Sequence, residues 1–145
     1  MEYRPLFFDK AADALKPVLE NLPGKLVVID GRDGSGKSSL GRFLAWYFNV
    51  SLVETDHFLI GNGELSYDTK CIDQIITKRL SRPRPVIVEG IAILELMTTL
   101  KRSIDFHIYL RRLSFEGSHS LQSMLELYES NYHPAQVANL ILVVP

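Results

Sequence analysis

The sequence contains one cysteine, Cys71, in 145 residues. One thiol forms no intrachain disulfide, and a zinc site built from cysteines needs several thiols at close spacing. These two ways of holding a small domain together are therefore excluded. A domain of this length buries roughly two-thirds of the surface that its unfolded chain exposes, so we expect residues 1–145 to fold as one domain without them. The lack of disulfides also favours a reducing compartment, and the expected location is the cytoplasm.

Long apolar runs and dense positive charge are missing as well. No apolar run approaches the length that spans a bilayer, and residues 1–10 carry acidic side chains and lack the apolar core of a secretory signal. The 16 lysines and arginines are scattered and balanced by 17 acidic residues, unlike the broad basic face of a protein that grips nucleic acid. We therefore expect neither a membrane nor a nucleic acid as partner. The composition leaves the oligomeric state open.

Five short apolar runs rich in β-branched residues alternate with segments of helical periodicity. This pattern is typical of an α/β fold in which helices cover a parallel sheet. The predicted strands are Lys25–Asp30, Val50–Thr55, Pro85–Glu89, Phe106–Leu110 and Leu140–Val144. The predicted helices are Asp9–Asn21, Lys37–Phe48, Asp68–Leu80, Ile91–Leu100 and Ser118–Asn131. Pro17 would remove an interior hydrogen bond from the first helix, so this segment is predicted either as one helix or as two short turns.

Residues 31–38 read Gly-Arg-Asp-Gly-Ser-Gly-Lys-Ser and match the phosphate-loop pattern G-x-x-x-x-G-K-[ST]. A chance match in a chain of this length is expected roughly one time in two hundred. The motif also follows a predicted strand and precedes a predicted helix, which is the setting that it requires. The sequence therefore predicts a site for the phosphates of ATP with Mg²⁺.

Each part of this loop has a separate expected task. Gly34 and Gly36 allow positive φ angles and close approach of the backbone to phosphate. Lys37 is expected at the β- and γ-phosphates, and the Ser38 hydroxyl at Mg²⁺. The residues expected at the nucleotide are Gly31, Arg32, Asp33, Gly34, Ser35, Gly36, Lys37, Ser38 and Ser39. Within this set, the side chains of Arg32 and Asp33 face either solvent or a lid.

Carboxylates follow two of the predicted strands. Ligands of open parallel sheets bind beyond the carboxyl ends of the strands, so these carboxylates are expected near the phosphate loop. Glu89 is a candidate for binding Mg²⁺ or orienting a hydroxyl, and its alternative is a helix N-cap. Asp56 is a candidate to accept the proton of a substrate hydroxyl, and its alternative is a solvated loop acid. Glu54 is the reserve for Asp56.

The chain resembles the uridine kinase-like group of P-loop kinases, which also includes phosphoribulokinase and pantothenate kinase. Beside the phosphate loop, the resemblance rests on residues 54–58 (Glu-Thr-Asp-His-Phe), 65–68 (Leu-Ser-Tyr-Asp) and 86–91 (Val-Ile-Val-Glu-Gly-Ile). Order and spacing match over most of the chain. The resemblance implies that Asp56 is the base for the hydroxyl, that Tyr67 and Asp68 lie beside the substrate, and that Glu89 is the acid after the third strand.

The same resemblance implies a five-stranded sheet in the order 2-3-1-4-5 and an arginine-bearing lid after the fourth strand. Arg111 and Arg112 stand where that lid would start, and their charge is suited to a transferring phosphoryl group at the nucleotide. The alternative is a pair of surface arginines. His57 either touches the substrate or γ-phosphate or lies at the surface. The insert that encloses a nucleoside base in this group is shortened here to residues 61–64.

These patterns together predict an ATP-dependent kinase that phosphorylates a hydroxyl of a nucleoside-like or other small metabolite. The alternative is a non-catalytic nucleotide-binding module with a reduced lid. A regulatory GTPase is disfavoured, because the chain has no N-K-x-D segment to read guanine and no D-x-x-G after the third strand.

Overall fold

The computed structural model of the chain describes residues 5–61 and 66–145. At its centre is a sheet of five parallel strands in the order β2-β3-β1-β4-β5, which confirms the α/β class and the predicted strand order. The strands are β1 (Leu26–Gly31), β2 (Ser51–Glu54), β3 (Val86–Glu89), β4 (Phe106–Arg112) and β5 (Leu140–Val144). Every residue of β1 and β3 is buried, because helices cover both faces in the middle of the sheet.

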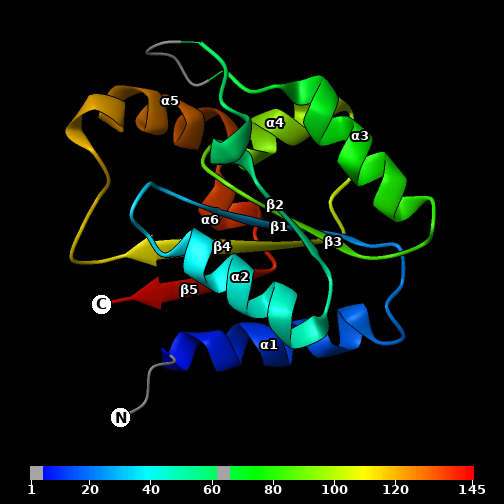
Figure 1. The fold of residues 1–145 in the computed structure, drawn as a ribbon. Coiled ribbons are helices and arrows are strands. Elements are labelled where there is room, and N and C mark those ends of the chain that lie inside the picture. Colours follow the sequence, from blue (N-terminus) through cyan, green and yellow to red (C-terminus); the bar gives the residue numbers. More distant parts are fainter. Residues whose placement is uncertain (1–4, 62–65) are drawn as a thin grey trace.

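Helices form one layer on each face of the sheet (Figure 1). The α-helices are α1 (Leu6–Leu19), α2 (Lys37–Phe48), α3 (Thr69–Leu80), α4 (Ile93–Leu100), α5 (Gln122–Tyr132) and α6 (Pro134–Val137). Helices α1 and α2 pack against Val27 and Ile29 on one face, and α3 and α4 pack against Val28 and Val88 on the other. Helix α5 lies beside α4 on the second face. The core is thus divided in two by the sheet.

The segment around Pro17 is one continuous helix and not two turns. Pro17 stands two residues before the end of α1, so the hydrogen bond that it removes belongs to the last turn. The buried residues of α1 recur at helical spacing and hold its whole length on the sheet. They are Phe8, Ala11, Ala12, Leu15 and Leu19.

Several predicted elements differ from the structure in extent, and three of the differences lie near the carboxyl ends of the strands or in the last helix. Strand β2 ends at Glu54, and the following residues form the 3-10 helix η1 (Thr55–Phe58). Strand β4 continues to Arg112, because β5 is long enough to pair with it up to Val144. The predicted last helix is divided into the 3-10 helix η2 (His119–Leu121) and α5.

Helix α6 follows α5 and lies outside the five helices predicted from periodicity. His133 separates the two helices with a left-handed φ of 49°, and Pro134 starts the new helix.

In residues 5–61 and 66–145, no helix has both the length and the apolar character to cross a bilayer. Residues Asn62, Gly63, Glu64 and Leu65, which carry most of the shortened insert and the start of the motif before Tyr67, lie outside the described residues.

Gly90 is needed where β3 approaches η1. A Cβ atom at this position would lie 1.9 Å from Oγ1 of the buried Thr55. We expect Gly90→Ala to lower the free energy of unfolding by about 1–3 kcal/mol through overpacking, as measured by urea denaturation. The double variant Gly90→Ala, Thr55→Ala is the control, because it removes the clashing hydroxyl. Equal stability of Gly90→Ala and the wild type would contradict this account.

Candidate phosphate-binding site

The phosphate loop connects the buried end of β1 to the first turn of α2. Gly34 and Gly36 have φ angles of 74° and 102°, as the sequence predicted. Gly36 is the N-cap of α2, so the free amides and the positive end of the helix dipole face the loop. Ser35 in the loop is buried and Ser39 in the first turn of α2 is exposed. The backbone therefore has the form that binds an anion at a helix N-terminus.

Lys37 points back into this loop. Its side-chain amine donates a hydrogen bond of 2.8 Å to the carbonyl oxygen of Arg32. Burial lowers the pKa of Lys37, and the carboxylates of Glu89 and Asp30 oppose this shift. The amine is thus a largely desolvated donor at the centre of the loop.

Ser38 and Glu89 meet beside Lys37. The Ser38 hydroxyl donates to Oε1 of Glu89 at 3.1 Å. Burial raises the pKa of Glu89, while the charge of Lys37 and the bond from Ser38 lower it. Glu89 ends β3, and β3 pairs directly with β1, so the strand order brings this carboxylate to the loop.

A hydroxyl and a carboxylate side by side are hard oxygen ligands of the kind that Mg²⁺ prefers. Within residues 5–61 and 66–145 there is no group of three or more His, Cys, Asp or Glu side chains that could hold a metal ion. A metal at Ser38 and Glu89 would therefore complete its shell with phosphate oxygens and water. This is how Mg²⁺ is usually held in nucleotide sites, so the residues fit it.

Asp56 and His57 lie on η1, directly after β2. Both are exposed. Nδ1 of His57 is 3.8 Å from Oε2 of Glu54, and Arg42 binds the same carboxylate at 2.7 Å. Glu54, the reserve candidate, therefore has two partners, whereas Asp56 presents an exposed carboxylate.

Tyr67 and Asp68 flank the same region. Tyr67 forms an antiparallel bridge with Leu59, just after η1. Burial raises the pKa of Tyr67, and the negative charge of Asp56 adds to the shift. Asp68 caps α3, because its Oδ1 accepts the amide of Cys71 at 3.0 Å. The motif thus has a structural task in addition to its expected place beside a substrate.

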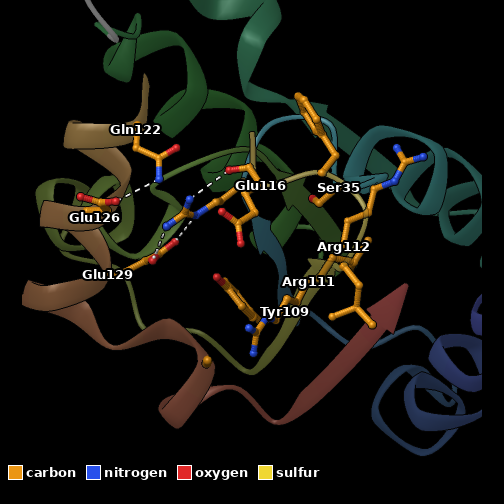
Figure 2. A pocket seen from close by; sticks show the side chains of 13 residues that line it. Ser35, Tyr109, Arg111, Arg112, Glu116, Gln122, Glu126 and Glu129 are labelled. Carbon is orange, nitrogen blue, oxygen red and sulfur yellow. Dashed lines mark hydrogen bonds and ion pairs between the residues drawn. The ribbon is translucent and has the colours of Figure 1, made fainter. Parts of the chain in front are cut away.

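Arg111 and Arg112 belong to the end of β4 and not to the start of a lid, since both pair with β5. Both side chains are exposed. Arg112 donates to the carbonyl oxygen of Gly34 at 3.0 Å. Arg111 and Arg112 both line a cavity of about 360 Å³ together with Tyr109 (Figure 2).

The side chains of Arg32 and Asp33 turn away from the inside of the loop. Arg32 binds Glu129 of α5, and Asp33 accepts the amide of Ser118 at 2.8 Å. These partners lie 97 and 85 residues further along the chain, and no local pattern marks them. The two orientations expected for these side chains were toward solvent and toward a lid. Both side chains point toward the connection that follows β4, where Glu116 and Ser118 lie. The ring of Phe115 from this connection covers Gly34, where a Cβ atom would lie 2.5 Å from the ring.

Comparison with known proteins finds likeness in structure only. No protein-family model matches the chain, and no curated protein matches it. Sheet order and flanking helices are those of P-loop kinases of small molecules, and the chain has this fold.

Three solved structures illustrate the likeness. A possible uridine kinase from Bacillus stearothermophilus has a TM-score of 0.68 and 13% identity, over 93% of this chain and 96% of that one. A sugar kinase from Janibacter sp. HTCC2649 has a TM-score of 0.55 and 16% identity, over 84% of this chain and 85% of that one. A gluconokinase from Sinorhizobium meliloti 1021 has a TM-score of 0.54 and 21% identity, over 85% and 83%. At these identities the likeness establishes the fold alone.

The raised pKa of Glu89 means that its charged form lowers the free energy of unfolding, by an amount that depends on pH. The folded protein holds this proton more tightly than the unfolded chain does, so this group's stabilising contribution falls as pH rises from the ordinary value of 4.5 through the raised folded value. The free energy of unfolding of Glu89→Gln minus that of the wild type should therefore be larger at pH 8 than at pH 4, as measured by urea denaturation. The exposed Glu95→Gln on α4 is the control. A stability difference that is the same at both pH values would contradict the prediction.

Proposed function

We propose that this protein is an ATP-dependent kinase that transfers the γ-phosphoryl group to a hydroxyl of a small metabolite. The observation that carries the proposal is the cluster of Lys37, Ser38 and Glu89 at the mouth of the loop. The buried amine and the loop amides are suited to the phosphates, and the hydroxyl with its carboxylate is suited to Mg²⁺. Lys37 and Ser38 come from the first turn of α2 and Glu89 from the end of β3, and they meet because β3 pairs directly with β1.

The acceptor hydroxyl is assigned to the side of the loop formed by η1 and the start of α3. Asp56 is the proposed base, since its exposed carboxylate can accept the hydroxyl proton as the phosphoryl group moves. Tyr67, Asp68 and His57 are proposed to contact the acceptor. Mg²⁺ bound between Ser38 and Glu89 would withdraw negative charge from the phosphate oxygens.

Positive charge on the other side of the loop comes from β4. Arg112 already contacts the loop through Gly34, and Arg111 stands one residue before it. We assign to both the stabilisation of charge on the phosphates. The solved kinases of similar fold are named for uridine, sugars, gluconate and shikimate, which all carry hydroxyls, and this supports an alcohol as acceptor.

Incubation with γ-labelled ATP, Mg²⁺ and a panel of nucleosides, sugars, hydroxy acids and vitamins tests the reaction. Transfer of label to one class of acceptor is the expected result. Tight binding of Mg-ATP with no transfer to any acceptor would support the non-catalytic module instead.

Removal of the Asp56 carboxylate is expected to affect turnover and not nucleotide binding. Asp56→Asn should lower kcat by about 10²- to 10⁴-fold, because a general base acts only as the hydroxyl reacts. The dissociation constant of Mg-ATP, measured by calorimetry, should stay unchanged. Glu54→Gln is the matched variant, since this carboxylate is close in sequence but bound by Arg42. A larger loss of turnover in Glu54→Gln than in Asp56→Asn would reverse the assignment.

Removal of the Lys37 amine is expected to weaken nucleotide binding itself. Lys37→Ala should raise the dissociation constant of Mg-ATP by about 10- to 100-fold, because a hydrogen-bonded charge on the phosphates is lost. Lys70→Ala, an exposed lysine on α3, is the control. Calorimetry that finds the same affinity in Lys37→Ala and the wild type would rule out the proposed role of the loop.

A further inference from the structure

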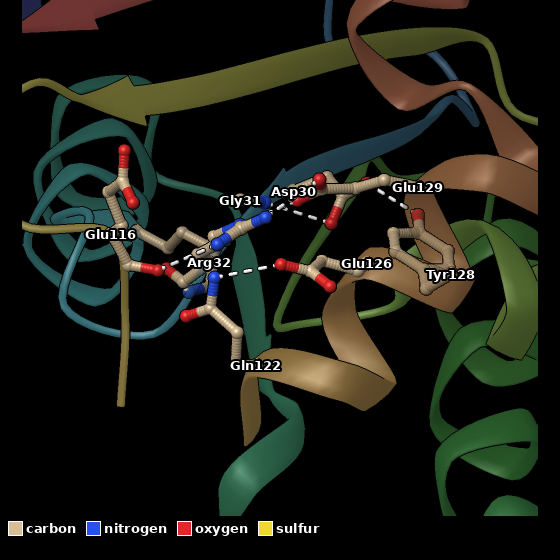
Figure 3. A network of polar contacts seen from close by, with 9 residues as sticks. Asp30, Gly31, Arg32, Glu116, Gln122, Glu126, Tyr128 and Glu129 are labelled. Atoms are coloured by element: carbon tan, nitrogen blue, oxygen red, sulfur yellow. Dashed lines mark hydrogen bonds and ion pairs between the residues drawn. The ribbon is translucent and has the colours of Figure 1, made fainter. Parts of the chain in front are cut away.

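The phosphate loop is joined to α5 by a two-pronged ion pair (Figure 3). Nε of Arg32 donates to Oε1 of Glu129 at 2.7 Å, and Nη2 donates to Oε2 at 2.9 Å. Nη1 donates to the carbonyl oxygen of Glu116 at 3.0 Å. A fork of this kind fixes the guanidinium plane as well as its position. All three guanidinium nitrogens of Arg32 therefore donate hydrogen bonds to residues outside the loop.

Tyr128, the residue of α5 that precedes Glu129, contacts Asp30 near the end of β1, just before the loop. The hydroxyl of Tyr128 donates to Oδ2 of Asp30 at 2.5 Å and accepts the amide of Leu94 at 3.1 Å. Asp30 is fully buried, and its Oδ1 accepts the amide of Gly31 at 2.8 Å. Burial raises the pKa of Tyr128, and the charge of Asp30 adds to this, so the hydroxyl keeps the proton that it donates. One carboxylate thus connects α5 to the first glycine of the loop.

A third contact fastens the connection that leads into α5. Oδ2 of Asp33 accepts hydrogen bonds from the amide of Ser118 at 2.8 Å and from its hydroxyl at 2.5 Å. Gly117 has a φ of 93°, and a Cβ atom there would lie 2.6 Å from Oδ1 of Asp33. A side chain at position 117 would therefore collide with Asp33 of the loop.

We propose that Tyr128 and Glu129 are positioning residues for the phosphate loop, and that Arg32 is the loop's anchor to α5 and not a ligand of phosphate. This proposal rests on the proposed function in taking a nucleotide as the ligand. A loop with three glycines loses much conformational freedom when it is ordered around an anion. Bonds to a helix order the loop before the ligand arrives, and the affinity for the ligand rises by the entropy that is no longer lost on binding.

Hydrogen exchange in the nucleotide-free protein tests the anchoring by itself. The amides of Gly31 and Ser35 are the reporters, since they donate to Asp30 and to the carbonyl of Arg32. In Tyr128→Phe and Glu129→Gln we expect at least one of these amides to exchange about tenfold faster, with the amides of β3 unchanged. Glu126→Gln is the matched control, because this glutamate of α5 pairs with Gln122 and not with the loop. Unchanged exchange at both amides in both variants would overturn the proposal.

Calorimetric titration with Mg-ATP then separates an anchor from a phosphate ligand. An anchor loses its effect when either partner is removed, so Arg32→Met, Glu129→Gln and the double variant should each raise the dissociation constant by roughly tenfold, about 1.4 kcal/mol. The Michaelis constant for the acceptor should stay close to the wild-type value. Reversal of the pair, Arg32→Glu with Glu129→Arg, should recover part of the affinity.

A phosphate ligand gives a different pattern. If Arg32→Met loses affinity while Glu129→Gln binds as the wild type does or more tightly, Arg32 contacts phosphate directly and the proposal is wrong. Failure of the proposed function is recognised separately, because the wild type would then bind no Mg-triphosphate while the exchange measurement still decides whether α5 anchors the loop.

Discussion

Two opposite charges are buried at the carboxyl edge of the sheet, and the arrangement of the candidate site depends on them. Lys37 is 7% exposed and Glu89 is 2% exposed, so neither keeps its full hydration. Each partly offsets the other's cost, since the charge of Glu89 raises the pKa of Lys37 and that of Lys37 lowers the pKa of Glu89. This compensation requires β3 to lie next to β1, with Glu89 in register with Ile29.

The site is built at the expense of local stability. A desolvated amine and a buried carboxylate with a raised pKa are each unfavourable by themselves. The apolar layers on both faces of the sheet carry this cost, because the strands below the site are wholly buried. Ionisable groups perturbed by burial in this way are typical of places where a protein presents groups to a ligand.

The phosphate loop also divides its surroundings into two sides. The residues proposed for the acceptor come from η1 and the start of α3, which follow β2 and precede β3. The residues that hold the loop come from the end of β4 and from α5. The side of β4 and α5 is therefore bound into the fold by hydrogen bonds and an ion pair, whereas the other side carries the residues proposed for the acceptor.

The sequence by itself determined the strands, most helices and the phosphate loop, because these depend on periodicity and on motifs within a few residues. It also placed Asp56 and Glu89 at strand ends, where a parallel sheet gathers ligand-binding groups. Only the tertiary structure decided that Arg32 binds Glu129, that Asp30 binds Tyr128 and that β4 extends through both arginines. Those outcomes depend on partners that lie far apart in the chain and meet only when the sheet and its helices are packed.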